Sequence, residues 1–157
     1  IKNSEIIENN WQTLDKDFAG ELPDSPVLVP LNFLLENTAI LDTDSSVGVW
    51  LDSEQSSEAL EPYLDKLSLI AINFPKFADG RGYSYARILR DRFCYGGELR
   101  AIGDILHDQL FYLKRCGFDS FDVREDKNIE IASQGLNDFS DSYQTATDQQ
   151  EPLFRRR

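Results

Sequence analysis

Cysteine and histidine are scarce in this chain of 157 residues, which excludes several kinds of metal and redox site. The two cysteines, Cys94 and Cys116, form neither a C-x-x-C pair nor any spacing typical of a zinc or iron–sulfur site. His107 is the only histidine. We therefore expect no bound metal, no cofactor and two reduced thiols.

Long apolar runs are also missing, and basic residues are outnumbered by acidic ones. No stretch approaches the roughly 20 apolar residues that span a bilayer, and the first residues do not lead into a signal-peptide core. The formal net charge is -12, whereas binding to nucleic acid or to anionic membranes needs clustered Lys and Arg. We expect a cytoplasmic protein that binds neither nucleic acid nor a membrane.

The charge is unevenly distributed along the chain. Between Lys76 and Arg115 there are eight basic and five acidic residues, a net of +3, which leaves -15 for the rest of the -12 total. Arg87 and Arg90 fall one turn apart on the expected exposed face of a helix. Such a basic middle could mark an anion site, and solvated helix faces produce similar counts.

The length suits one domain with a hydrophobic core. From Val47 onward, short β-branched runs alternate with segments of helical period, which is the pattern of βα repeats around a mostly parallel sheet. The sequence predicts an α/β fold, either doubly wound or a partial βα barrel. We assign 1–46 to a short N-terminal extended region packing on the domain, 47–145 to the α/β domain and 146–157 to a flexible, basic-ended tail.

The periodicity also places the individual elements. Strands are predicted at 47–51, 69–73, 99–102 and 121–123, and helices at about 56–67, 84–93, 103–117 and 129–145. Ser84 and Asp104 are natural N-cap residues for two of these helices. Residues 6–11 are typical of a hairpin with a polar turn, and 27–29 of another extended segment.

Ligands of parallel sheets and βα barrels gather at the carboxyl ends of the strands. The longest loop there, 76–84, combines two glycines, two cations, two aromatic rings and a hydroxyl before a helix. Backbone N–H groups, the helix dipole and Arg81 could bind a phosphate, sulfate or carboxylate. The candidate anion-binding residues are Lys76, Asp79, Gly80, Arg81, Gly82, Tyr83, Ser84, Arg87 and Asp104.

A purely structural interpretation of this loop is equally open. Gly80 and Gly82 would then permit a tight turn, while Asp79 and Ser84 satisfy backbone donors. The glycines fit no Walker loop, and a dinucleotide fingerprint would need a third glycine where Tyr85 stands.

Few groups could carry acid–base or nucleophilic chemistry. Asp104 is either a helix N-cap or, together with Asp79, an acid or base in one cleft with one pKa raised. His107 falls in the first turn of a helix, where a surface or capping role is commoner than catalysis. Cys116 falls at a helix C-terminus, where the dipole disfavours a thiolate, so we expect a packed thiol.

Three segments resemble a bacterial family: FPKFADGRGYS at 74–84, GELRAIGDIL at 97–106 and RCGFD at 115–119, together with PLFRRR at 152–157. The family is domain-of-unknown-function family nine hundred and thirty-four, typically found beside assimilatory sulfite reductase and often described as a probable oxidoreductase. The likeness covers 47–123 closely and the first forty residues loosely. Cys94 and His107 lie outside the family's motif, and no catalytic residues carry over.

The resemblance implies a role near cysteine biosynthesis. Our leading hypothesis is an accessory or anion-binding protein of sulfite assimilation, with sulfite reductase or another sulfur-assimilation protein as partner. The alternative is a small enzyme that acts on an anionic metabolite by carboxylate acid–base chemistry. A docking peptide and a solubilising tail are both compatible with the final residues, Leu153, Phe154, Arg155, Arg156 and Arg157.

Overall fold

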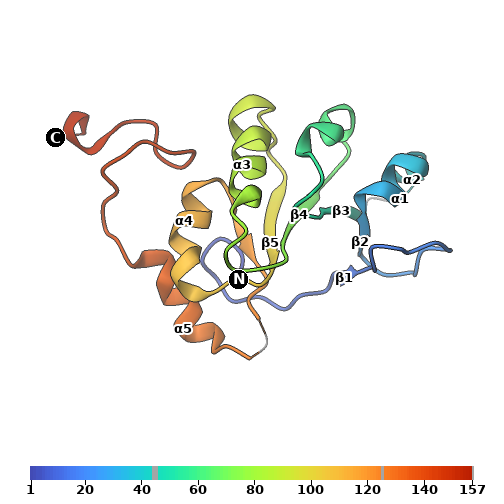
Figure 1. Cartoon of the computed structure of the whole chain (residues 1–157), viewed down its shortest axis with the longest axis horizontal. Coiled ribbons are helices and arrows are strands. Elements are labelled where there is room, and N and C mark those ends of the chain that lie inside the picture. The colour runs from blue at the N-terminus through green and yellow to red at the C-terminus, as the bar shows by residue number, and fades with distance from the viewer. Residues whose placement is uncertain (44–45, 125, 157) are drawn as a thin grey trace.

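The computed structural model describes residues 1–43, 46–124 and 126–156 (Figure 1). Its centre is a six-stranded, all-parallel sheet in the order β1-β2-β3-β4-β5-β6. A doubly wound sheet would reverse its strand order at a switch point. The sequential order therefore confirms the α/β prediction and selects the partial βα barrel, a curled half-barrel. The strands are β1 (Gln12–Thr13), β2 (Val27–Pro30), β3 (Val47–Leu51), β4 (Leu69–Phe74), β5 (Glu98–Gly103) and β6 (Ser120–Phe121).

The outer face of the sheet forms the main hydrophobic core. Side chains alternate between the faces of a strand, and Val49 and Ile72 point outward with no exposed surface. Leu89 and Leu113 of the helices belong to the same core, and burying each such side chain stabilises the fold by about 1.5–3 kcal/mol. The helices are α1 (Leu31–Glu36), α2 (Ile40–Thr43), α3 (Arg81–Arg87), α4 (Leu110–Arg115) and α5 (Ile129–Gln134).

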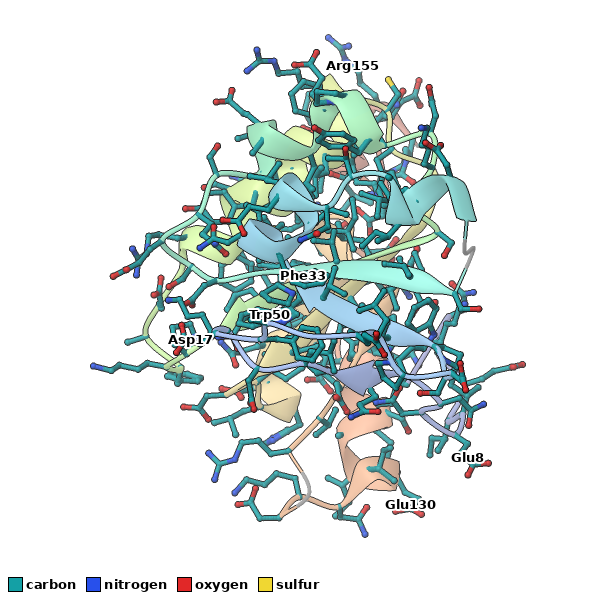
Figure 2. The ribbon with its side chains drawn as sticks, turned by 90° about the vertical axis from the view of Figure 1, so that its right-hand side faces the viewer. Glu8, Asp17, Phe33, Trp50, Glu130 and Arg155 are labelled. Carbon is teal, nitrogen blue, oxygen red and sulfur yellow. The ribbon has the colours of Figure 1, made fainter. Side chains whose placement is uncertain are left out.

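The inner face carries a second, smaller cluster. Trp50 and Ile102 pack there with Leu28, Leu69 and Ala71, and Trp11 covers part of the cluster. The Trp50 indole N–H donates to the Leu14 carbonyl at 2.9 Å, which ties β3 to the chain beyond β1. Figure 2, seen from the side of β1 and β2, shows Trp50 in the interior.

The N-terminal segment differs from the predicted hairpin at 6–11. The tight turn lies earlier, between Lys2 and Glu5, with Asn3 and Ser4 at positive φ. Lys2 also pairs antiparallel with Ser120 at the edge of β6. The chain then passes below the sheet to β1 on the opposite edge (Figure 1). The hairpin prediction is wrong because the turn is formed by residues 2–5, and residues 6–11 form no ladder with one another. The extended segment predicted at 27–29 is confirmed as β2.

Helix boundaries also differ from the sequence predictions. The helix expected at 56–67 is a 3-10 helix, η1 (Ser57–Tyr63), with Pro62 inside it and Ser56 as its N-cap. The helix expected from Ser84 begins three residues earlier, at Arg81, and continues as a π-helical turn, η2 (Ile88–Arg92). Ser84 is therefore inside α3 and is not its N-cap.

The two last helices are shorter than expected. After β5, Gly103 has φ +94° and a 3-10 turn, η3 (His107–Gln109), precedes α4, so Asp104 is not an N-cap. The final helix ends at Gln134, and one 3-10 turn, η4 (Gly135–Asn137), follows. Gly135 packs directly on the His107 carbonyl. Within the described ranges, no helix has the length and apolar character needed to cross a membrane.

Candidate functional site

Polar residues follow the carboxyl ends of β3, β4, β5 and β6, which meet at one edge of the parallel sheet; we call this edge the carboxyl rim. Asp52 accepts hydrogen bonds from Lys16 Nζ at 2.6 Å, the Ser53 N–H at 2.8 Å and Asn73 Nδ2 at 3.4 Å. The bond from Lys16 is the main reason why the pKa of Asp52 is lowered. The carboxylate is therefore ionised at neutral pH.

The β4–α3 loop adds an ion pair to this rim. Arg81 donates to Asp79 from Nε at 2.9 Å and from its terminal nitrogen at 2.6 Å, and it also reaches Ser53 Oγ at 2.9 Å. The pKa of Asp79 is lowered and that of Arg81 is raised, chiefly by the hydrogen bonds between them. The guanidinium thus already has a carboxylate as its partner.

Asp104 forms a separate ion pair on the other side of the loop. Its carboxylate accepts the Phe77 N–H at 3.0 Å and Arg124 at 2.7 Å, and Arg124 also pairs with Asp126 at 2.9 Å. The pKa of Asp104 is lowered chiefly by the hydrogen bond from Arg124 and then by that from the Phe77 N–H. Asp104 therefore clamps the loop backbone to the end of β5.

Gly82 and Tyr83 of the loop have packing roles. A Cβ at Gly82 would lie 2.6 Å from Phe74 Cζ, so glycine is needed where α3 crosses β4. The Tyr83 ring contacts Phe74 with centroids 5.3 Å apart, and its hydroxyl accepts a hydrogen bond from Gln109 at 3.1 Å. Gly80 precedes the first residue of α3 at φ -87°.

The remaining members of the predicted anion site are dispersed. Lys76 and Ser84 are exposed. Arg87 lies at the last position of α3, whereas Arg81 opens that helix, and it pairs with Asp91 at 2.6 Å. The structure therefore brings Asp79 and Arg81 together and leaves Arg87 at the other end of the helix.

The acid–base interpretation required one of Asp79 and Asp104 to have a raised pKa. Both pKa values are lowered by hydrogen bonds from arginines, Arg81 and Arg124 respectively. This expectation is wrong, since neither carboxyl holds a proton that it could donate at neutral pH.

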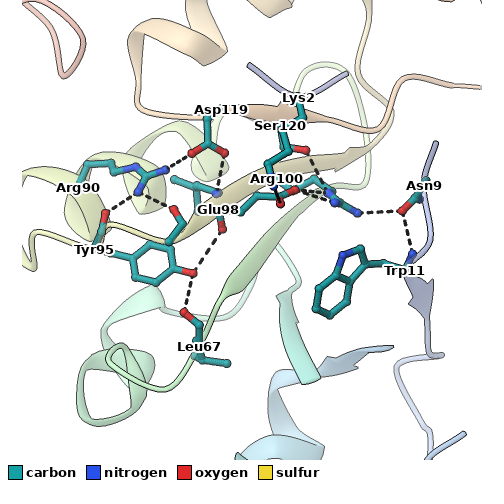
Figure 3. Close-up of polar contacts among 12 residues, drawn as sticks. Lys2, Asn9, Trp11, Leu67, Arg90, Tyr95, Glu98, Arg100, Asp119 and Ser120 are labelled. Carbon is teal, nitrogen blue, oxygen red and sulfur yellow. Dashed lines mark hydrogen bonds and ion pairs between the residues drawn. The ribbon is translucent and has the colours of Figure 1, made fainter. Parts of the chain in front are cut away.

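Sequence reasoning missed a polar network on the inner face (Figure 3). Arg100 is only 5% exposed and donates to Glu98 at 2.6 Å, to Ser120 Oγ at 3.1 Å and to Asn9 at 3.0 Å. Lys2 pairs with the other Glu98 oxygen at 2.6 Å. The sequence feature that could have predicted this network is the alternation of charged and apolar residues at the start of β5, which places Glu98 and Arg100 on the same face.

Arg90 is a second structural arginine, and the prediction of an exposed Arg90 is wrong. Its guanidinium donates to the carbonyls of Tyr95, Gly97 and Gly117 and pairs with Asp119 at 2.8 Å (Figure 3). The π-helical turn η2, with its i→i+5 hydrogen bonds, places side chains around the helix differently from the 3.6-residue period, and Arg90 points into the fold. The Arg90 guanidinium therefore already binds the loops before β5 and β6 and is not available to a ligand.

The two thiols and the histidine differ in exposure. Cys94 is exposed and Cys116 is buried, where burial raises the pKa of its thiol, as expected for a packed side chain. His107 is exposed at the start of η3, in the first turn before α4. Over residues 1–43, 46–124 and 126–156, no three His, Cys, Asp or Glu side chains are grouped to hold a metal ion.

The C-terminal end folds back as a 3-10 helix, η5 (Leu153–Arg155). The Leu153 N–H donates to the Tyr143 carbonyl at 3.1 Å, and Arg156 donates to the Ser142 carbonyl at 2.6 Å. Phe154 is 61% exposed, with the Arg155 guanidinium 5.9 Å from its ring centroid. Arg157, which the docking prediction includes, lies outside the described residues.

The fold and these ion pairs define an α/β half-barrel protein with a polar carboxyl rim. The family model of bacterial proteins of unknown function, DUF934, matches residues 48–154, and the chain belongs to this family. No curated protein matches the chain.

Proposed function

We propose that this protein is a non-enzymatic accessory protein of assimilatory sulfite reduction that docks on sulfite reductase through its C-terminal end, Leu153–Arg156. One observation carries the proposal: η5 holds Phe154 exposed with Arg155 stacked beside it. Aromatic residues and arginine are the residue types that dominate binding energy at protein interfaces.

The fixed conformation of this end supports a docking role. The bonds from Leu153 to Tyr143 and from Arg156 to Ser142 hold the turn in place before any partner arrives. A segment that is already ordered loses less conformational entropy on binding. The preformed turn thus favours docking over a purely solubilising role.

The charge of the docking surface indicates what kind of surface its partner presents. The chain as a whole carries -12, whereas Arg155 and Arg156 are cations at one end of it. Figure 2 shows Arg155 at the opposite end of the molecule from Glu130. Such an end would be attracted to an acidic surface, with an association rate that falls as salt is added. The resemblance described above supplies sulfite reductase as the candidate partner.

The carboxyl rim supports binding of a free anion less well. Arg81 and Arg124 on this rim already pair with Asp79 and Asp104, and Lys16 pairs with Asp52. An incoming anion would have to compete with these carboxylates. An accessory role through the C-terminal end therefore accounts for the geometry better than an anion-binding rim.

Biolayer interferometry with purified assimilatory sulfite reductase tests this function. We expect saturable binding by the full chain, loss of binding by a chain ending at Glu151, and weakening by Phe154→Ala. Ile131→Ala is the matched control, since Ile131 is an exposed apolar side chain on α5. Equal binding by the full and shortened chains would refute the docking role.

A further inference from the structure

An aromatic groove lies between α4 and the segment that follows η4. It has a volume of about 410 Å³, which falls within the range of small-molecule sites. Phe111 and Tyr112 of α4 line one side, and Phe139 and Tyr143 line the other. Arg87, the last residue of α3, also lines it. We call this hollow the α4 groove.

The rings of the α4 groove are unusually open to solvent. Tyr112, Phe139 and Tyr143 are 58%, 64% and 67% exposed. Large apolar side chains are normally covered, and a grouped exposed set marks a binding surface more often than isolated ones do. The Phe111 and Phe139 rings touch across the groove, with centroids 4.9 Å apart, so its two sides meet there.

The outer wall of the groove is held in place by polar contacts. Arg115, 7% exposed, donates from α4 to Ser142 Oγ at 2.5 Å, to Asp148 at 2.9 Å and to the Gln144 carbonyl. The Thr147 N–H donates back to the Arg115 carbonyl at 3.2 Å. Because these contacts need no ligand, the groove exists before anything binds.

Arg87 supplies the groove with a cation that still has donors to spare. Its ion pair with Asp91 uses Nε, at 2.6 Å. Within the part of the chain that the structure describes, its two terminal nitrogens have no hydrogen-bond partner. Both terminal nitrogens of Arg115, by contrast, already donate to Ser142, Asp148 and Gln144. The remaining charged residue of the lining is Asp141. The free edge of a guanidinium matches the geometry of a carboxylate, sulfonate or phosphate.

We propose that the α4 groove binds a small molecule that has an aromatic ring and an anionic substituent. The ring would pack among Tyr112, Phe139 and Tyr143, and the anion would accept hydrogen bonds from the terminal nitrogens of Arg87. The C-terminal docking turn borders this site, since Leu153 and Arg156 donate to the Tyr143 and Ser142 carbonyls and the Phe154 ring lies 6.4 Å from that of Tyr143. The proposal rests on Arg87 and the groove rings and not on the docking role.

Two fluorescent probes that differ in charge test the proposal on the full chain. They are 8-anilinonaphthalene-1-sulfonate and its neutral relative N-phenyl-1-naphthylamine. We expect Arg87→Gln to weaken the sulfonate about tenfold, the effect of losing a hydrogen bond to a charged group, and to leave the neutral probe unchanged. Phe139→Ser should weaken both probes.

Matched controls separate the groove from the rest of the surface. Arg92→Gln removes another exposed arginine of the same helical segment, one that pairs with Glu58, and Ile131→Ser removes another exposed apolar side chain. Neither should change either dissociation constant by more than about twofold. The proposal is overturned if Arg87→Gln and Arg92→Gln affect the sulfonate equally, if Phe139→Ser has no effect, or if the wild-type chain shows no saturable binding.

Discussion

Arg90 and Asp119 form an ion pair at 2.8 Å between residues that are 29 positions apart in the chain. The same guanidinium reaches the carbonyls of Tyr95, Gly97 and Gly117. One side chain thus joins the end of the α3–η2 helix to the loops that enter β5 and β6.

Replacing Arg90 with methionine should destabilise the fold strongly. The change removes the Arg90 donor from the partly buried Asp119 carboxylate, which then keeps the bond from the Leu99 N–H, and from three carbonyls, a loss of about 3 kcal/mol. Urea unfolding followed by circular dichroism measures it. Arg92→Met is the control, because the exposed pair of Arg92 with Glu58 should contribute less than about 1 kcal/mol. Similar midpoints for the two variants would contradict the role assigned to Arg90.

Gly82→Ala should also destabilise the protein, by about 1–3 kcal/mol, because the new methyl group would overlap the Phe74 ring. Thermal unfolding gives the shift in Tm. Gly96→Ala is the matched change, since a Cβ there has no atom within 4 Å. An alanine at position 82 that is as well tolerated as one at position 96 would show that α3 does not pack on β4 as described.

Acid should remove the stabilisation that comes from the Lys16–Asp52 pair. The folded-state pKa of Asp52 is below the ordinary value of 3.8, so its contribution is complete above that value and is lost as the pH falls through the lowered pKa. The free energy of unfolding should therefore drop less between pH 5 and pH 3 in Asp52→Asn than in the wild type. Lys16→Met, which removes the main cause of the shift, should behave in the same way. If the free energy of unfolding drops as much between pH 5 and pH 3 in both variants as in the wild type, the stabilising role of the Lys16–Asp52 pair is contradicted.

The positions of the central strands could be predicted well, because strands that are buried on both faces consist of short, continuous apolar runs. The runs at 47–51 and 69–72 are apolar on both faces, as is typical of strands buried on both sides, and both strands are found where expected. The order of the strands could not be predicted, since it depends on how successive βα units pack.

The candidate site could be predicted less completely, because the ion-pair and hydrogen-bond partners of its charged side chains lie far away in the sequence. Asp104 follows a strand, as expected, but Arg124 and the Phe77 N–H, each at least 20 positions away, take its carboxylate. No local pattern reports that Arg90 turns inward, since this depends on the π-helical turn of η2. The sequence shows two apolar residues beside cations at 153–157 and predicts a flexible tail, whereas the structure has a 3-10 turn at Leu153–Arg155.

The docking role of the C-terminal end is the central claim, and the affinity of charge-reversed chains for sulfite reductase tests it most directly. We predict that Arg155→Glu with Arg156→Glu raises the dissociation constant at least about tenfold, a loss of about 1.4 kcal/mol. Lys66→Glu with Arg92→Glu makes the same change in net charge at exposed positions elsewhere and should leave the constant within about twofold. Equal weakening by the two double variants, or none by either, would contradict docking through this end.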